Sequence, residues 1–105
     1  MSQRFPNELL RSLRNDLPID RLIRTLDVPC KEREGYLRFL CPRCSEFHTA
    51  TNPKTNLARC FRCRVNFNAI ELVMAVEGYC FVDAVKALVP LLEARRRFSS
   101  QTRST

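Results

Sequence analysis

The stretch that decides the fold is residues 41–63, CPRCSEFHTATNPKTNLARCFRC. It contains two Cys-x-x-Cys pairs, Cys41 with Cys44 and Cys60 with Cys63, separated by fifteen residues. This spacing is typical of a zinc ribbon, in which two tight turns each supply two thiolates to one tetrahedral ion. All four ligands are then protein thiolates and no position is left for water or substrate. We therefore predict one structural Zn²⁺ held by these four cysteines.

The cysteines have alternative interpretations, which the rest of the sequence disfavours. Disulfides are expected in secreted chains, but residues 1–8 contain no apolar core of a signal peptide. A thioredoxin-type redox pair needs a βαβ pattern that the chain lacks. His48 is an alternative ligand to Cys44, although a polar loop residue is the simpler interpretation. Cys30 and Cys80 have no close cysteine partner and are predicted to be small buried apolar residues.

Composition excludes several classes of protein. The chain has 105 residues, enough for one compact domain, and a formal net charge of +7. Its two glycines cannot build a glycine-rich phosphate loop, and its single histidine leaves little for acid–base catalysis. No stretch approaches the roughly 18 apolar residues that a membrane span needs. We therefore expect a cytoplasmic binding protein with reduced thiols, and not an enzyme.

Hydrophobic periodicity before the cysteine pairs predicts two helices and a sheet. Two short amphipathic helices are predicted over 9–17 and 19–26, one on each side of Pro18. Gly35 and the turn at 52–56 each indicate a hairpin. The cysteine-rich middle of the chain is therefore predicted to be a small antiparallel sheet.

Two further helices are predicted after the second cysteine pair. Asn68 and Glu71 form a capping box that opens a helix ending near Gly78. The apolar face of the next helix consists of Phe81, Ala84, Val85, Leu88 and Leu92. Pro90 is expected to end or kink this helix near residues 87–89.

The periodicity as a whole predicts an α+β fold, a zinc ribbon on an antiparallel sheet flanked by helices. We divide the chain into an N-terminal helical segment at 1–18, a zinc-binding domain at 19–93 and a basic tail at 94–105. The tail contains four arginines and little apolar content, so we expect it to be disordered.

Positive charge is concentrated in the predicted ribbon. Residues 31–64 carry eight basic and three acidic side chains, a net charge of +5. Aromatic residues are interleaved with them, a composition suited to phosphate neutralisation and base stacking. The candidate contacts to nucleic acid are Arg38, Arg43, Lys54, Arg59, Phe61, Arg62 and Arg64. A solvated face remains the alternative for the arginines, and strand alternation places at least one of Tyr36 and Phe39 in the core.

The motifs after the cysteine pairs support a more specific interpretation. Asn68-Ala-Ile-Glu-Leu-Val-Met74 is followed by Glu77-Gly78-Tyr-Cys-Phe81-Val-Asp-Ala84-Val85. Together with the cysteine pairs and Asp20-Arg-Leu-Ile23, they resemble the N-terminal zinc-binding domain of bacterial DNA primases. The resemblance runs from about residue 19 to residue 92. It implies a zinc ribbon that helps a primase contact the single-stranded template and the initiating primer end.

The chain departs from this family pattern at several positions. The family usually has His at the position of Cys44, so this site would be all-cysteine. Glycines usually follow the last cysteine, where this chain has residues 64–67, and Cys80 stands where a serine often caps the second helix. No catalytic polymerase domain follows. If this sequence is the whole protein, we expect a stand-alone chain that cannot polymerise nucleotides itself.

Three function hypotheses follow. The first is a single-stranded DNA-binding module that assists primer initiation together with a separate catalytic subunit. The alternative is an adaptor that docks onto a replication polymerase or helicase through the acidic, apolar helices of residues 69–92, without strong DNA binding of its own. A reader of duplex DNA ranks last, because no helix is strongly basic. The oligomeric state does not follow from the sequence.

Overall fold

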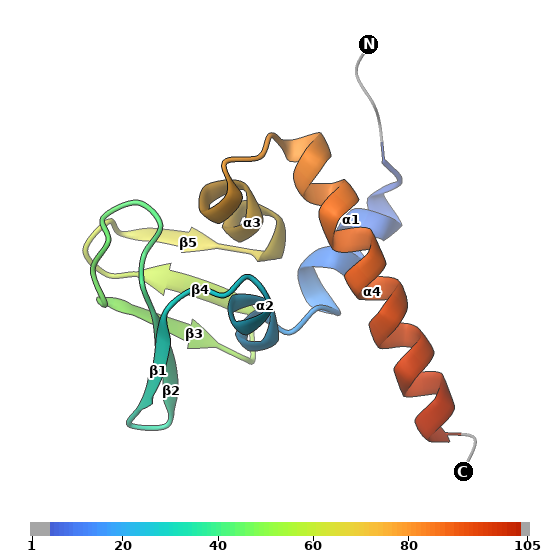
Figure 1. Cartoon of the computed structure of the whole chain (residues 1–105), viewed down its shortest axis with the longest axis horizontal. Coiled ribbons are helices and arrows are strands. Elements are labelled where there is room, and N and C mark those ends of the chain that lie inside the picture. Colours follow the sequence, from blue (N-terminus) through green and yellow to red (C-terminus); the bar gives the residue numbers. More distant parts are fainter. Residues whose placement is uncertain (1–4, 104–105) are drawn as a thin grey trace.

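The computed structural model describes the backbone of residues 5–103 and the side chains of residues 5–97. The strands gather at one end of the molecule and α1 and α4 at the other, with α2 and α3 between them (Figure 1). In chain order, the elements are α1 (Asn7–Asn15), α2 (Ile19–Thr25), β1 (Cys30–Arg33), β2 (Tyr36–Phe39), β3 (Thr49–Asn52), β4 (Leu57–Cys60), β5 (Val65–Phe67), α3 (Ala69–Glu77) and α4 (Phe81–Arg103). The predicted α+β fold is confirmed.

The strands form two small antiparallel sheets. β1 and β2 form a hairpin whose turn contains Gly35 at φ 81°, a left-handed conformation that glycine adopts without strain. β3, β4 and β5 form the second sheet in that order, and residues 53–56 join its first two strands. Both predicted hairpins are therefore present. β5 is not among the predicted strands, because three residues give too little periodicity to identify a strand.

Thr49 joins the two sheets. Its side-chain hydroxyl accepts a hydrogen bond from the Phe39 amide at 2.8 Å and donates one to the Phe39 carbonyl. Phe39 is the last residue of β2 and Thr49 the first of β3, and both are fully buried. One hydroxyl thus satisfies two buried backbone groups and fixes the first sheet against the second.

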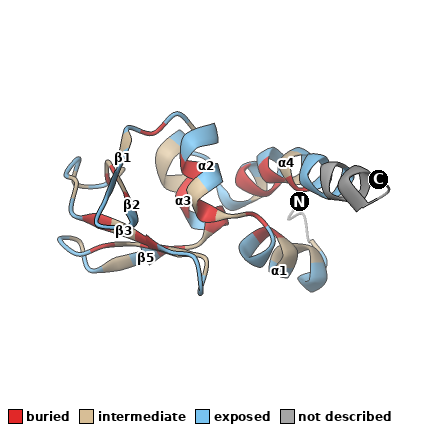
Figure 2. Cartoon of the chain, turned by 90° about the horizontal axis from the view of Figure 1, so that it is seen from below, coloured by how far each residue is buried: buried red, intermediate tan, exposed pale blue. Residues whose placement is uncertain are grey.

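One apolar core lies between the helices and the inner faces of the sheets. α1, α3 and α4 pack against one another and bury Leu13, Leu72 and Leu88. On β2, Leu37 and Phe39 point into the core, while Tyr36 is exposed and Arg38 half-buried. Figure 2 shows the buried residues on the inward sides of the helices and strands. The expected alternation along β2 is confirmed.

The α3 helix begins and ends as its sequence predicts. The Asn68 side-chain oxygen accepts from the Glu71 amide at 2.8 Å, and the Glu71 carboxylate accepts from the Asn68 amide at 3.2 Å. Gly78 terminates the helix at φ 71°. The capping box and the left-handed glycine fix the direction in which the chain enters and leaves α3.

The α4 helix corrects two expectations. It runs from Phe81 through Pro90 to Arg103, so Pro90 does not end it and the basic tail is helical up to Arg103. Pro90 and Lys86 are both exposed, so water can bond the Lys86 carbonyl that loses its partner at Pro90. Arg95 donates to the Asp16 carbonyl just after α1, and Arg96 donates to the Ser12 hydroxyl on α1. These two bonds hold the part of α4 that lies beyond Pro90. Residues 1–4 and 104–105 of the predicted segments lie outside the described residues.

The two unpaired cysteines differ from each other. Cys30 is half-buried and packs against the core, close to what we expected. Cys80 is exposed, so its predicted burial is wrong. It lies between α3 and α4, where its carbonyl accepts from the Ala84 amide at 3.0 Å and its side chain is left outside the core. Among the helices that the structure describes, none is long and apolar enough to cross a lipid bilayer.

Candidate metal centre and nucleic-acid interface

Two matching turns present the four cysteines. In the first, between β2 and β3, the Ser45 amide donates to the Cys41 carbonyl at 2.9 Å. In the second, between β4 and β5, the Arg64 amide donates to the Cys60 carbonyl at 2.8 Å. Ser45 and Arg64 both have left-handed backbones, at φ 58° and 57°. Each Cys-x-x-Cys pair is therefore followed by a left-handed residue that turns the chain back towards the next strand.

The four sulfur atoms converge to one point. They all lie within 4.8 Å of one another, with Cys41 Sγ 3.9 Å from Cys63 Sγ and Cys44 Sγ 3.6 Å from Cys60 Sγ. A tetrahedral zinc ion with Zn–S bonds of about 2.3 Å requires its ligands to be about 3.8 Å apart. A disulfide would bring two sulfurs to about 2.05 Å. The geometry therefore fits Zn²⁺, and the prediction of one structural zinc is confirmed. Cys41, Cys44, Cys60 and Cys63 form the cluster that would hold it.

Backbone amides point at the sulfurs. The Arg43 amide donates to Cys41 Sγ and the Cys63 amide to Cys60 Sγ, both at 3.4 Å. Such bonds stabilise negative charge on a thiolate and hold it in position for the metal. His48 is not part of the cluster: its side chain is exposed, and its carbonyl accepts from the Phe61 amide at 2.7 Å.

Three of the clustered thiols have a pKa that is shifted from its ordinary value, in different directions. Burial alone would raise the pKa of Cys60, but hydrogen bonds from the Cys63 amide and from the other thiols outweigh it and lower that pKa to about 7. Burial and the neighbouring thiols raise the pKa of Cys63 to about 12, and burial also raises the pKa of Cys41. Cys60 thus loses its proton more readily than Cys41 or Cys63 does, and zinc binding displaces the thiol protons that remain.

A groove on the outer face of the ribbon collects four of the predicted nucleic-acid contacts. It has a volume of about 650 Å³ and lies over the outward sides of β2, β3 and β4. Arg38, Lys54, Arg59 and Phe61 all line it, together with Tyr36. Tyr36 is 53% exposed and Phe61 57% exposed. We call this feature, defined by Tyr36, Arg38, Lys54, Arg59 and Phe61, the sheet groove.

Polar contacts orient the cations of the sheet groove. The Arg59 guanidinium donates to the Asn66 side chain at 3.2 Å and lies 5.8 Å from the centre of the Phe61 ring. The Nε atom of Arg38 is buried without a hydrogen-bond partner in the described part of the chain. The Asn52 side chain accepts from the Lys54 amide at 3.0 Å, which shapes the β3–β4 turn. Arg59 is therefore held in place, and Arg38 retains an unused donor.

The other three predicted contacts lie elsewhere. Arg43 borders a separate hollow with Tyr79 and one side of α3. Arg62 and Arg64 are exposed on the second cysteine turn, and Arg62 lies 3.8 Å from the Glu46 carboxylate. The structure therefore does not gather all seven predicted residues on one face. The structure adds Tyr36 to the predicted contacts. The sequence pattern left open whether Tyr36 or Phe39 faces the core.

Comparison with known proteins agrees with this geometry. Residues 5–104 match the family model of the CHC2 zinc finger. The chain is also 31% identical over 94 residues to a DNA primase of Halalkalibacterium halodurans, an alignment that covers 84% of this chain and 15% of that primase. The chain thus spans a small part of the relative that it matches.

The paired cysteine turns, the converging sulfurs and the α3 cap agree with a match that extends over nearly all of the chain. The resemblance to primase zinc-binding domains, which the sequence motifs indicate, is confirmed by the same match. The chain belongs to the CHC2 zinc finger family and is a primase-type zinc ribbon.

Proposed function

We propose that this zinc ribbon binds single-stranded DNA template in the sheet groove and assists primer initiation together with a catalytic subunit on another chain. The observation that carries the proposal is the lining of the groove, where three cations lie beside two exposed aromatic rings. Cations neutralise backbone phosphates, and exposed rings stack on bases. Both kinds of group are needed to hold an unpaired strand.

The aromatic rings favour a single strand over a duplex. In duplex DNA the faces of the bases are already stacked on one another, so an exposed Tyr36 or Phe61 ring has no base face to contact. In a single strand each base can stack on such a ring, worth about 1–3 kcal/mol per base regardless of its identity. The proposed groove therefore binds single strands with little sequence preference.

The three remaining arginines form a second, competing surface. Arg43, Arg62 and Arg64 surround the two cysteine turns and are all exposed. The Glu46 carboxylate near Arg62 offsets part of this charge. Their contact with DNA remains a prediction. We place the main contact in the sheet groove because three cations lie beside two exposed aromatic rings there, whereas Arg43 has the single exposed ring of Tyr79 beside it in a hollow that Glu71 also lines.

The test is fluorescence anisotropy of the zinc-loaded protein with labelled single-stranded and duplex DNA of equal length, at several salt concentrations. We expect preference for the single strand and a log–log salt slope of roughly −2 to −3, as three or four phosphate contacts give. Arg38→Gln with Arg59→Gln should weaken single-strand binding strongly. Arg62→Gln with Arg64→Gln is the matched control, because it removes the same charge close to the zinc site. Equal losses in the two double variants would place the contact outside the groove.

The proposed partner is a separate primase or polymerase subunit, and the proposed location is the cytoplasm. The supporting comparison is the DNA primase that this chain matches over 15% of its length. Primer synthesis by the candidate catalytic subunit, measured with and without this protein, tests the assisting role. Stimulation by the wild-type protein but not by the Arg38→Gln, Arg59→Gln variant would support it, and equal synthesis in all three reactions would contradict it.

A second candidate is the protein-interaction adaptor, which a different surface favours. Tyr79 and Phe81 are 40% and 41% exposed around the turn between α3 and α4, and Phe5 packs on Phe81 with ring centres 6.3 Å apart. Exposed aromatics of this size are typical of protein interfaces. If single-stranded DNA binds no more tightly than duplex while Tyr79→Ala abolishes stimulation of the catalytic subunit, the adaptor is the better description.

A further inference from the structure

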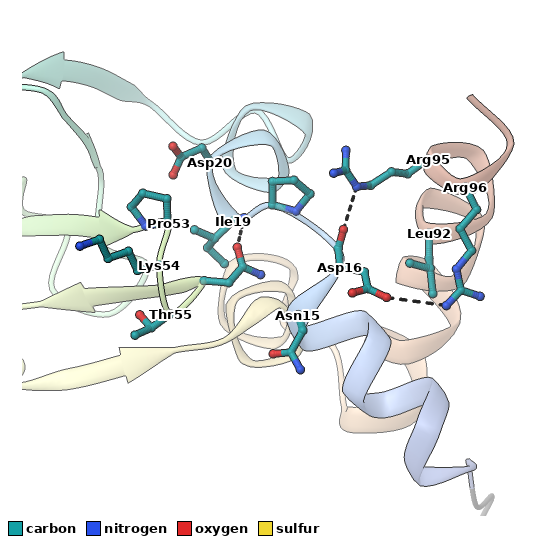
Figure 3. Close-up of a pocket in the computed structure, with 12 residues that line it drawn as sticks. Asn15, Asp16, Ile19, Asp20, Pro53, Lys54, Thr55, Leu92, Arg95 and Arg96 are labelled. Atoms are coloured by element: carbon teal, nitrogen blue, oxygen red, sulfur yellow. Dashed lines mark hydrogen bonds and ion pairs between the residues drawn. The ribbon is translucent and has the colours of Figure 1, made fainter. Parts of the chain in front are cut away.

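A second hollow adjoins the sheet groove, and the proposed function gives it no role. It has a volume of about 780 Å³ and lies between the β3–β4 turn, the α1–α2 connection and α4. Lys54 lines it from the turn, and Arg95 and Arg96 line it from α4 (Figure 3). We call it the α4 hollow.

The α4 hollow and the sheet groove meet at one turn. Pro53, Lys54 and Thr55 line both of them, so the two depressions lie on either side of the same three residues. Figure 3 shows the Lys54 side chain directed away from α4 and towards the strands, while the Arg95 side chain reaches from α4 towards Asp16. Cations thus stand on both sides of the α4 hollow, Lys54 at the turn and Arg95 and Arg96 on α4, and the carboxylates of Asp16 and Asp20 line it with them.

The walls of the α4 hollow are fixed relative to each other. The Asn56 side chain accepts from the Ile19 amide at 2.8 Å and donates to the Arg14 and Leu17 carbonyls at 2.7 and 2.6 Å, which holds the β3–β4 turn to α1 and α2. On the other side, Arg95 Nε donates to the Asp16 carbonyl at 2.8 Å. Because both walls are attached to residues 14–19, the hollow keeps its shape without a ligand.

Among the described residues that line the hollow, Arg95 is a cation with no carboxylate paired to it, and Asp20 is a carboxylate whose Oδ1 atom is buried without a hydrogen-bond partner. The Nε atom of Arg95 donates to a neutral backbone carbonyl, so the positive charge of Arg95 is retained. Arg96 lies 3.8 Å from the Asp16 carboxylate and is partly neutralised, and Asp20 adds a second carboxylate to the lining. The net charge of the lining is modest, which suits a singly charged phosphodiester of a nucleic-acid backbone.

We propose that the α4 hollow is a second contact for the same DNA strand and receives backbone phosphates of nucleotides that extend past the β3–β4 turn, with Lys54 at the crossing and Arg95 as the main cation. This inference rests on the proposed binding of single-stranded DNA in the sheet groove. It adds a direction to that binding, from the sheet towards α4. It also assigns a role to Arg95 and Arg96 of α4, which do not line the sheet groove.

The test compares strand lengths with the zinc-loaded full chain. Labelled oligothymidylates of about 4 and about 12 nucleotides are titrated by anisotropy, since small single-strand binding folds occupy lengths in this range. Arg95→Gln should weaken binding of the long strand about fivefold at 0.1 M salt and reduce its log–log salt slope by about 0.7, as expected for one lost phosphate contact. Binding of the short strand, which the sheet groove accommodates, should not change.

The control is Arg97→Gln, which removes the same charge from the same helix at an exposed position that does not line the hollow. Arg95→Lys should restore long-strand binding because it keeps the charge. Equal losses for both strand lengths, or equal losses in Arg95→Gln and Arg97→Gln, would overturn the inference while leaving the sheet groove standing. Absence of binding by the wild-type protein at either length would instead overturn the proposed function, and this inference with it.

A second measurement does not depend on the stability of any variant. Arginine-selective modification of the wild-type protein, read by mass spectrometry, reports which guanidinium groups the DNA covers. The inference requires that the long strand protects Arg95 from modification and that the short strand does not. Modification of Arg95 at the same rate with and without the long strand contradicts it.

Discussion

The residues that follow the two cysteine pairs have a left-handed backbone although neither is glycine. Ser45 and Arg64 hold left-handed conformations at φ 58° and 57°, which cost L-residues roughly 1 kcal/mol and glycine almost nothing. The zinc-binding domains that the sequence resembles usually have glycines soon after the last cysteine. Arg64 thus adopts the left-handed backbone of this turn although it carries a side chain.

Replacement of Arg64 by glycine should therefore stabilise the protein. We expect the free energy of unfolding of zinc-loaded Arg64→Gly to rise by up to about 1 kcal/mol, because the strain at φ 57° is relieved. Arg62→Gly is the control, since Arg62 is exposed on the same turn without a left-handed backbone, and it should be neutral or destabilising. Denaturant unfolding of the three proteins gives the comparison. A less stable Arg64→Gly would show that the arginine side chain holds the turn.

Cys44 is the ligand at which the chain departs from its family. It is half-buried, so a larger imidazole can be accommodated at the edge of the cluster. We expect Cys44→His to retain one zinc ion, because a Cys₃His set is also tetrahedral, and Cys44→Ser to lose it. Release of zinc to a coloured chelator measures both. Loss of zinc from Cys44→His would mean that the geometry around Cys44 is specific for a thiolate.

At the scale of elements, one side chain links the two sheets. Thr49→Val keeps the shape of the side chain but removes the hydroxyl that bonds both the amide and the carbonyl of Phe39. Each unsatisfied buried backbone group costs about 1–3 kcal/mol, so the free energy of unfolding should fall by roughly 2–4 kcal/mol. Thr55→Val, an exposed position in the β3–β4 turn, should change it little. Equal stabilities would show that water replaces the Thr49 hydroxyl.

Asn56 links elements that are far apart in the sequence. Its side chain bonds the Ile19 amide at the start of α2 and the Arg14 and Leu17 carbonyls at and after the end of α1. Asn56→Gly tolerates the left-handed backbone at φ 54° and removes only these bonds, so we expect a loss of about 2–3 kcal/mol in stability. Asn52→Ala removes a side-chain bond that is local to the turn and should cost less than about 1 kcal/mol. Thermal unfolding followed by circular dichroism distinguishes the two, and losses of equal size would contradict the linking role.

The sequence predicts those elements whose signals are local. The α3 cap needs only Asn68, Glu71 and Gly78, and each hairpin is marked by its own turn. The path of α4 through Pro90 is not local, because it depends on bonds from Arg95 and Arg96 to the α1 end of the chain. β5 is paired by β4 and has only three residues to identify it. Tertiary contacts decide both.

The same distinction applies to the site. The zinc ligands follow from spacing, because each Cys-x-x-Cys turn is a local structure that presents two thiolates. The sheet groove does not follow from spacing, because Tyr36 and Arg38 on one sheet meet Arg59 and Phe61 on or beside the other. How the two sheets face each other is set by tertiary contacts, among them the bonds from Thr49 to Phe39 and the packing of β2 against β3. A list of basic residues drawn from the sequence therefore mixes two groups. Arg38 and Arg59 line the groove, whereas Arg62 and Arg64 do not.

At the scale of the whole molecule, the apolar core is distributed unevenly. Most of the large buried side chains belong to the helices, while β3, β4 and β5 contribute chiefly small residues such as Thr51 and Ala58. Strands this short with so few large buried side chains need a further source of stability. Zinc supplies it, since a structural ion adds on the order of 10 kcal/mol to folding.

This dependence on zinc makes the ribbon sensitive to pH. Thiols have an ordinary pKa of about 8.5 and are thiolates when bound to zinc, so the bound state has the lower pKa. The stabilisation by zinc is therefore complete above that range and is lost progressively as the pH falls. Because the pKa of Cys60 is lowered to about 7, the folded metal-free site releases that proton near neutrality, while Cys63, raised to about 12, holds its proton until the ion binds.

The number of protons that zinc displaces can be measured as the slope of log apparent zinc affinity against pH. Between pH 7 and 8 we expect a positive slope of about three to four, determined by competition with a chelator of known affinity. Cys44→His should lower this slope by about one, because imidazole with its ordinary pKa of about 6.5 is already neutral there. Cys80→Ser, which removes an exposed cysteine outside the cluster, should leave the slope unchanged. Equal slopes in the wild type and Cys44→His would mean that Cys44 does not bind the metal as a thiolate, and a slope that changes in Cys80→Ser would place a fifth thiol in competition for the ion.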